Sequence, residues 1–215
     1  MPARPPRAAR PRLAIHPLTP ERWPDLVKLF GPRGACAGCW CTWWRLSRPE
    51  WKAGQASENR RRQERYVKAG NVAGLLAYAG GEPVGWVAIE PREAYPRLAR
   101  SRTLAPVDDR RVWSITCFFV ARPARGKGVT RALIDGAVRY ARTRGAAVVE
   151  AYPVDLGREV ADAWVYTGAA STFRELGFRE VARRSRTRPI VRKEIRRSRA
   201  GAGRGARSAR ASPAR

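Results

Sequence analysis

Residues 125–130 read Arg125-Gly126-Lys127-Gly128-Val129-Thr130, and they follow an apolar segment that runs from Val112 to Val120. The two glycines remove side chains from a turn and let backbone amides point at an anion, while Arg125 and Lys127 add positive charge. The positive end of a helix that begins at Val129 favours the same ligand. The stretch therefore predicts a strand-to-helix turn that holds phosphate groups. For the hexapeptide alone, a tight turn without a ligand is the alternative.

The apolar pattern on both sides of this turn predicts alternating strands and helices. Apolar residues recur every three or four positions from residue 129 to 141, which indicates an amphipathic helix that ends at Gly145. We expect strands at 13–16, 75–78, 83–90, 112–120, 147–152, 178–184 and 189–195, with a hairpin turn at Gly80-Gly81. Further helices are expected at 20–30, with Thr19 as N-cap, and at 57–69, 95–101 and 171–176.

Length and charge bound the organisation of the chain. Its 215 residues suit one domain with extensions, at roughly 150 residues per domain. We predict a folded domain at residues 11–196 between disordered basic tails at 1–10 and 197–215. The net charge of +26 raises the hypothesis of weak, nonspecific nucleic-acid binding through the arginine-rich tails, against compositional drift as the alternative. No segment is apolar enough to cross a membrane, so we expect a cytoplasmic protein, monomeric or homodimeric.

The order of these elements, with the turn at Arg125 and the closing run Phe173-Arg174-Glu175-Leu176-Gly177-Phe178, resembles the GNAT superfamily of acyl-CoA-dependent N-acyltransferases. The family pattern of Arg or Gln, two residues, Gly, one residue, and Gly or Ala is met by Arg125 and Gly128, while Thr130 departs from the small final residue. The resemblance implies an α/β fold. Its mixed central sheet would have six to seven strands and about four flanking helices, and a splayed strand pair would form the acyl-CoA cleft.

The resemblance also implies the co-substrate and the residues that bind it. The co-substrate is acetyl-CoA or another acyl-CoA, its acceptor is an amine, and no metal is expected. Pantetheine would lie along the backbone of Phe118, Phe119 and Val120, and the Val120 amide would polarise the thioester carbonyl. The pyrophosphate would meet the amides of Arg125, Gly126, Lys127, Gly128, Val129 and Thr130. Phe173 would adjoin the cofactor, where the family commonly has the tyrosine that serves as acid.

Acyl transfer to an amine needs a base for the ammonium proton and an acid for the departing thiolate. Because Phe173 has no proton to donate, the candidate acids are Tyr152 and Tyr166. Alternatively, the thiolate leaves unassisted, since a thiol has a pKa of about 8.5. The candidate bases are Glu150 and Asp155, acting directly or through water, and a salt-bridged structural carboxylate is the alternative for Glu150.

Several features remain open at the level of sequence. Arg45 and Arg92 are candidates for recognising an acidic acceptor, against a purely solvated role. The many tryptophans suggest a wide acceptor pocket, although most of them are expected in the core: Trp40, Trp43, Trp44, Trp86 and Trp113. The spacing Cys36-x-x-Cys39-x-Cys41, with Cys117, permits a zinc site, a redox pair or inert packing. Two other functions therefore compete with the enzyme: an arginine-tailed nucleic-acid-binding protein with a cysteine zinc site, and a non-catalytic GNAT-like acyl-CoA-binding protein.

Overall fold

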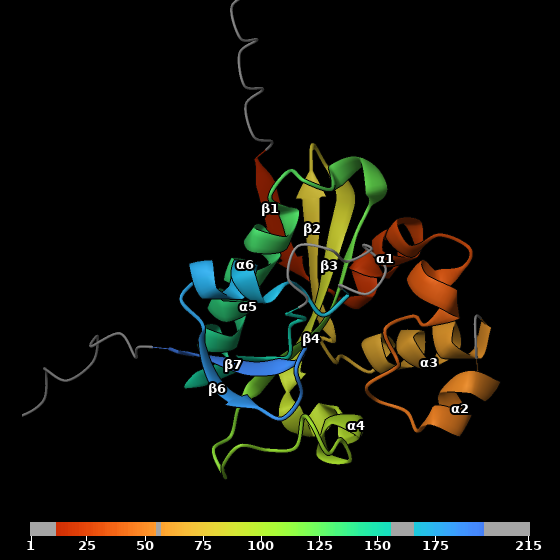
Figure 1. The fold of residues 1–215 in the computed structure, drawn as a ribbon. Coiled ribbons are helices and arrows are strands. Elements are labelled where there is room, and N and C mark those ends of the chain that lie inside the picture. Colours follow the sequence, from red (N-terminus) through yellow and green to blue (C-terminus); the bar gives the residue numbers. More distant parts are fainter. Residues whose placement is uncertain (1–11, 55–56, 156–165, 196–215) are drawn as a thin grey trace, which may run out of the picture.

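The computed structural model describes residues 12–54, 57–155 and 166–195 (Figure 1). Within these ranges the chain forms seven strands and six α-helices. The strands are β1 Leu13–Pro17, β2 Gly74–Ala79, β3 Glu82–Pro91, β4 Trp113–Val120, β5 Val148–Ala151, β6 Arg179–Arg183 and β7 Pro189–Glu194. The helices are α1 Trp23–Phe30, α2 Arg48–Ala53, α3 Ser57–Lys68, α4 Pro96–Ala99, α5 Val129–Thr143 and α6 Ala170–Glu175. The predicted tails lie outside the described residues.

The strands form one mixed sheet in the order β1-β2-β3-β4-β5-β7-β6. All neighbouring strands are antiparallel except β4 and β5, which are parallel and are connected through α5. The predicted Gly-Gly hairpin joins β2 to β3, and both glycines have positive φ, 57° at Gly80 and 84° at Gly81. A two-residue hairpin turn of this kind requires positive φ at both positions, which explains the glycine pair.

The pairing between β4 and β5 is short. It joins Trp113, Ser114 and Ile115 of β4 to residues 149–151 of β5, and the strands then part. β4 continues to Val120 along β3 alone, with one extra residue, Thr116, between the positions paired to Ile89 and Ala88. Such a bulge bends the strand that carries it. The second half of β4 consequently has an edge that β5 does not cover.

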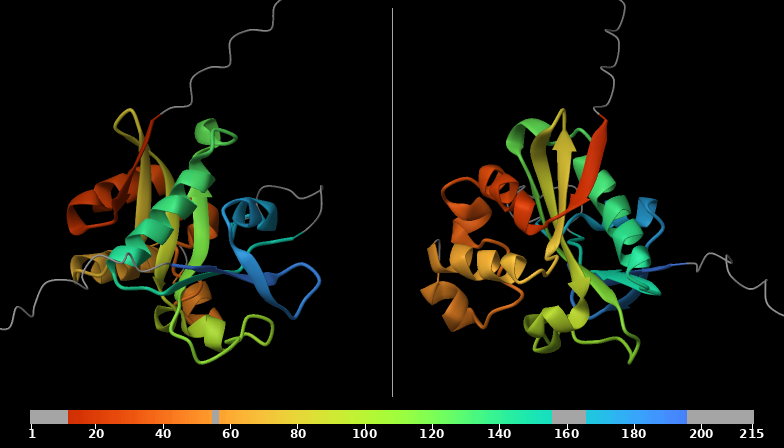
Figure 2. Two further views of the ribbon diagram at one scale, coloured as in Figure 1. Left: turned by 90° about the vertical axis from the view of Figure 1, so that its left-hand side faces the viewer. Right: turned by 180° about the vertical axis from the view of Figure 1, so that it is seen from behind.

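Helices cover both faces of the sheet, with α1 and α3 on one side and α5 on the other (Figures 1 and 2). The buried side of α5 packs on β2, β3 and β4 through Val129, Leu133, Ile134 and Ala137, which are at most 3% exposed. The approach is close at Gly85 of β3, where a Cβ atom would lie 2.6 Å from Val129 Cγ1. α5 is therefore held firmly against the strands that precede the glycine turn. No helix in the described part of the chain is both long enough and apolar enough to span a membrane.

The structure confirms the predicted fold class, with seven strands and more than the four helices expected. Thr19 is the N-cap as predicted, but of a short 3-10 helix, Pro20–Arg22, that leads into α1, and its hydroxyl makes no cap hydrogen bond. Helix α2 was not predicted, although its signal is present. Ser47 and Glu50 form a capping box, in which each side chain bonds the backbone amide of the other residue.

The packing of α5 supports a prediction about stability. Leu133 is fully buried between α5 and the sheet. Leu133→Ala should lower the free energy of unfolding by about 2–5 kcal/mol, since burial is lost and a cavity remains. Urea denaturation of the full chain measures this. The exposed Arg139 on the same helix provides the control Arg139→Ala, expected within about 0.5 kcal/mol of the parent protein. Equal losses in the two variants would contradict the packing described.

Candidate active site

The glycine turn leads directly into α5. Gly126 has φ 71° and Gly128, the N-cap of α5, has φ 81°, values that an L side chain adopts only with strain. A Cβ atom at either glycine would meet no protein atom within 4 Å, so the space in front of the turn is open. No side chain caps the first turn of this 15-residue helix. Open space in front of uncapped helical amides suits an oxyanion.

The other residues of the turn divide between surface and core. Arg125 and Lys127 are exposed, and Arg125 Nε donates to the carbonyl oxygen of Val120 at 3.3 Å, which folds the turn back on the end of β4. Val129 is 3% exposed and its side chain belongs to the core, so that only its backbone is available to a ligand. Thr130 is half-buried and its hydroxyl does not cap the helix. The predicted phosphate contacts are thus backbone amides flanked by two cationic side chains.

The free edge of β4 faces away from β3. The Ala121 amide donates to Val84 of β3, and because successive amides of a strand point in opposite directions, those of Phe118 and Val120 point toward the side that β5 has left. The Phe118 amide donates to the carbonyl oxygen of Tyr166 at 2.6 Å. Of the predicted pantetheine contacts on β4, the Phe118 amide is therefore occupied from within the protein.

A cavity of about 240 Å³ lies beside this edge. Its walls are mostly apolar and come from β4, the end of α1, the loop between α1 and α2, α2 itself and the segment before α6. The lining residues are Phe30, Ala35, Cys36, Ala37, Cys39, Cys41, Trp43, Trp44, Trp51, Cys117, Phe118, Phe119 and Tyr166. Trp44 is anchored to β4 by a hydrogen bond from its Nε1 to the Thr116 carbonyl oxygen, 3.1 Å long. Ala35, Ala37, Trp40 and Cys41 in the α1–α2 loop have positive φ. Strained backbone of this kind is concentrated at functional sites.

Of the predicted acids, Tyr166 and Tyr152 lie in different environments. Tyr166 is half-buried and lines the cavity beside Phe118. Tyr152 is fully buried, and its hydroxyl lies 2.8 Å from Ser114 Oγ, 2.6 Å from Glu150 Oε1 and 2.5 Å from Arg92 Nη1. Burial, and then the charge of Glu150, raise the pKa of Tyr152 well above its usual range.

Phe173 is a core residue. It is 0% exposed, and its ring packs edge-on against Phe178 and Phe118, with centroids 5.0 and 6.1 Å away. Its ring contacts Phe118 of the strand that lines the cavity, but Phe173 itself is not among the lining residues. A residue in this position supports β4 rather than presenting a surface to a ligand.

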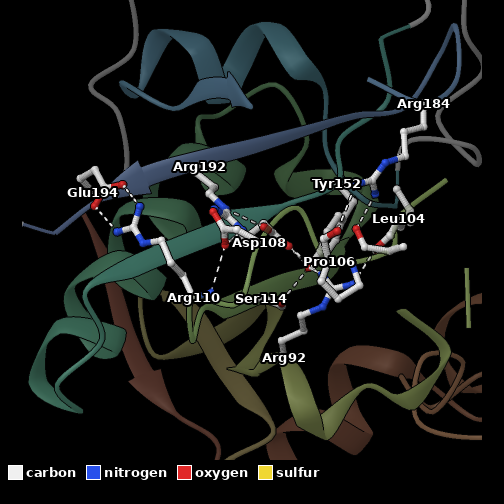
Figure 3. Close-up of polar contacts among 12 residues, drawn as sticks. Arg92, Leu104, Pro106, Asp108, Arg110, Ser114, Tyr152, Arg184, Arg192 and Glu194 are labelled. Atoms are coloured by element: carbon white, nitrogen blue, oxygen red, sulfur yellow. Dashed lines mark hydrogen bonds and ion pairs between the residues drawn. The ribbon is translucent and has the colours of Figure 1, made fainter. Parts of the chain in front are cut away.

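Glu150 lies in a buried ionic network where β5 pairs with β4 and β7, and Figure 3 shows the Arg92, Tyr152 and Arg192 side chains of this network. Its Oε1 accepts from Arg92 Nη1 at 2.7 Å and its Oε2 accepts from Arg192 Nε at 2.7 Å, while the residue is 0% exposed. Arg192 also bonds both oxygens of Asp108, at 2.6 and 3.1 Å, which lowers the pKa of that carboxyl. With both oxygens paired and no access to the cavity, Glu150 has the geometry of the salt-bridged structural carboxylate.

Asp155 and the two candidate arginines are also paired within the protein. Asp155 Oδ2 accepts from Arg183 Nη2 at 2.7 Å, and the Asp155 side chain is 28% exposed. Arg45 forms an ion pair with Glu90 beneath the rings of Tyr66 and Tyr95, and Arg92 belongs to the Glu150 network. The hypothesis that Arg45 and Arg92 recognise an acidic acceptor is therefore wrong, because internal carboxylates neutralise both.

All four cysteines line the cavity. Cys41 Sγ accepts a hydrogen bond from Trp86 Nε1 at 3.2 Å. A hydrogen bond from the Cys117 thiol, more than any other cause, lowers the pKa of Cys41. Nowhere in the described ranges do three His, Cys, Asp or Glu side chains come together in a way that would hold a metal ion. The zinc hypothesis gains no support from this arrangement.

The tryptophans suggested a wide acceptor pocket, and Trp43 and Trp44 do line the cavity, but sequence reasoning missed Trp51, which lines it as well. The spacing of these three residues gives no periodic signal, because they lie in an irregular loop and a short helix. Trp40 and Trp86 have the core position expected of most tryptophans, with 1% and 0% exposure. The aromatic cluster itself was visible in the sequence, but its division between core and cavity depends on how the α1–α2 loop folds.

Comparisons with known proteins agree with this architecture. A sequence model described as the acetyltransferase (GNAT) family matches residues 40–164, more than half of the chain. A GNAT-family acetyltransferase from Streptococcus agalactiae is 12% identical, with 86% of this chain and 96% of that chain covered and a TM-score of 0.52. Another from Listeria monocytogenes is 10% identical, with 85% and 95% covered and a TM-score of 0.51. At such identities these likenesses show the fold alone.

A PaiA N-acetyltransferase from Thermoplasma acidophilum, solved in complex with coenzyme A, is 12% identical, with 86% of this chain and 99% of that chain covered and a TM-score of 0.49. A search of curated proteins by sequence found no match.

The network around Glu150 supports a prediction about stability. Glu150→Gln keeps the side-chain volume but leaves Arg92 and Arg192 buried with one charged partner fewer. The free energy of unfolding should fall by about 3–5 kcal/mol, the usual effect of breaking a buried ion pair. The control is Glu175→Gln, which breaks the exposed pair with Arg131 and should change stability by less than about 1 kcal/mol. Urea denaturation measures both, and a small loss for Glu150→Gln would show that the network is not structural.

Proposed function

This chain belongs to the GNAT family of acetyltransferases, and we propose that it transfers an acetyl or other acyl group from acyl-CoA to the amine of an acceptor in a ternary complex. The observation that carries the proposal is the open glycine turn at the uncapped N-terminus of α5. It follows the strand whose edge β5 has left, so that one ligand can contact strand and turn together. The coenzyme supplies the activated acyl group when bound, and the protein supplies orientation.

In this proposal the backbone does most of the binding. The amides from residue 126 to 130, at the positive end of α5, hold the pyrophosphate, while Arg125 and Lys127 add charge at the rim. Because the Phe118 amide is bonded to Tyr166, we assign the Val120 amide to the thioester carbonyl. A donor fixed in a strand stabilises the oxyanion that develops there without reorganising first. The cavity beside Phe118 and Phe119 would admit the acceptor.

Proton transfer is assigned by access to the cavity. Tyr166 is the predicted acid that lines it, and we propose that Tyr166 protonates the departing thiolate. Neither Glu150 nor Asp155 lines the cavity, and each is ion-paired. We therefore infer that the ammonium proton of the acceptor passes to water at the mouth of the cavity. The neutral amine then attacks the acyl carbon directly, so that the C–N bond forms and the C–S bond breaks. The nitrogen loses its second proton, which returns through water to the Tyr166 oxygen that gave its own proton to the thiolate.

A measurement of turnover distinguishes the proposed enzyme from a non-catalytic acyl-CoA-binding protein. An acyl-CoA-binding protein would be stabilised by acetyl-CoA and release no coenzyme A with any amine. The nucleic-acid alternative depends on tails that lie outside the described residues, and no described feature favours it.

The glycine turn gives the first test. Acetyl-CoA should raise the melting temperature of the protein, by the equivalent of about 2.7 kcal/mol at 100 times Kd. Gly128→Glu should abolish this shift, because it places a carboxylate where the pyrophosphate would bind. The control is Gly145→Glu at the other end of α5, where φ is 80° and the space is equally open, so that the strain is matched. An undiminished shift in Gly128→Glu would contradict the proposed site.

The second test concerns Tyr166. Tyr166→Phe should lower kcat for coenzyme A release about 100-fold, as expected for the loss of a general acid, and leave the melting shift with acetyl-CoA unchanged. Tyr140→Phe on α5, whose hydroxyl bonds only Arg144 among the described residues, is the control and should keep full activity. An active Tyr166→Phe variant would mean that the thiolate departs without that acid.

A further inference from the structure

A second pocket, of about 470 Å³, adjoins the cavity and shares Trp43, Trp44 and Tyr166 with it. Four arginines contribute to its lining: Arg48, Arg97, Arg100 and Arg188. They come from α2, from α4 and the residue after it, and from the loop between β6 and β7. Three hydroxyl residues, Ser47, Ser101 and Thr103, line it as well, and no carboxylate is among the lining residues that the structure describes.

Arg97 and Arg188 are half-buried and Arg48 and Arg100 are exposed, and all four differ in their partners from the buried arginines of the chain. Arg45, Arg92 and Arg192 are each paired with a glutamate. In the described part of the chain, by contrast, no ion pair joins Arg48, Arg97, Arg100 or Arg188 to a carboxylate. Among the described residues these four guanidinium groups therefore have no salt-bridge partner, although Arg100 interacts electrostatically with Glu50.

Two of the guanidinium groups are positioned by neutral partners. Arg97 lies 3.6 Å from the centroid of the Trp43 ring, and its Nη1 donates to the Trp43 carbonyl oxygen at 3.2 Å. Arg188 lies 5.7 Å from the centroid of the Tyr166 ring. Desolvation lowers the pKa of Arg97, and the nearby charge of Arg48 acts in the same direction. Stacking orients a guanidinium and leaves donors in its plane for an oxyanion.

The pocket lies at the opposite end of the cavity from the glycine turn. Trp44 bonds Thr116 in the middle of β4, and residues 97–104 precede the start of that strand, whereas the turn follows its end at Val120. A coenzyme held at the turn would therefore reach the cavity from one end, and a molecule in the arginine pocket would reach it from the other. The same two tryptophans and Tyr166 would contact both.

On the premise of the proposed acyltransfer, we propose that the arginine pocket binds the anionic end of the acceptor, which is a small amine that also carries a carboxylate or a phosphate. Its amine extends past Trp43, Trp44 and Tyr166 to the thioester. Arginine binds either oxyanion through two parallel hydrogen bonds. A neutral amine of the same shape leaves the half-buried guanidinium of Arg97 without an anionic partner and binds more weakly for that reason.

The experiment compares matched amines by calorimetry on the full chain. Phenylalanine is set against 2-phenylethylamine, which lacks the carboxylate, and 2-aminoethyl phosphate against ethanolamine, which lacks the phosphate. The anionic member of at least one pair should bind about 10- to 100-fold more tightly, as for hydrogen bonds to charged groups. The pair that shows the larger ratio identifies the oxyanion.

Variants test whether the arginine pocket causes the difference in binding between the matched amines. Arg97→Gln and Arg188→Gln should each reduce the binding ratio at least severalfold. Arg97→Lys keeps the positive charge but not the planar guanidinium with its paired donors, so its ratio should lie between those of the parent protein and Arg97→Gln. The exposed Arg139 on α5 lies outside the pocket, so Arg139→Gln is the control and should keep the full ratio. Folding of every variant is checked by its melting temperature.

The outcomes separate this inference from the proposed function. Equal binding within both pairs, or a ratio unchanged in Arg97→Gln, would overturn the inference even if coenzyme A release occurs with neutral amines. A raised KM for acetyl-CoA in Arg97→Gln, with an unchanged KM for the acceptor, would assign the pocket to the coenzyme and also overturn it. Selective binding of the anionic amine without any turnover would support the pocket and contradict the acyltransferase.

Discussion

The separation of β4 from β5 after three residue pairs is the constraint on which the site depends. Backbone amides inside a protein need partners, and the second half of β4 loses its partner on one side. The carbonyl of Tyr166 satisfies Phe118, and the Val120 amide points into the gap. The cavity, the aromatic wall and the glycine turn are all arranged around this edge. A sheet that remained paired to the end of β4 would leave no place for a ligand.

The strands stay apart because other contacts hold each of them in place. α5 packs closely on β3 at Gly85, which holds the end of β4 and the turn. On the other side, Glu150 is bonded to Arg92, which directly follows β3, and to Arg192 of β7, one residue before the last paired position of β5. The buried charges thus lie where the two strands still touch. Beyond that point, β5 turns toward β7 and the segment before α6.

Most of the fold follows from local sequence signals. Apolar periodicity, Gly80-Gly81 and the turn at Arg125 predicted the strands and long helices, because these signals act within a few residues. The family resemblance supplied the splayed pair, which no local signal encodes. The roles of charged residues were harder to predict. Arg45 and Arg92 find carboxylates far along the chain, and Arg97 and Arg188 meet only when α4 and the β6–β7 loop come together. Long-range pairing of this kind leaves no pattern in a single sequence.

The trio of Arg92, Glu150 and Arg192 has a consequence for how such a protein changes over evolutionary time. Well-packed apolar residues can often replace a buried ionic group without loss of stability. Each single substitution on that route, however, leaves a buried charge without its partner, and stability margins of 5–15 kcal/mol, about the usual range, tolerate few such steps. The three residues are therefore expected to persist together in descendants of this chain, whether or not they take part in chemistry. Their persistence would record a barrier between sequences rather than a catalytic requirement.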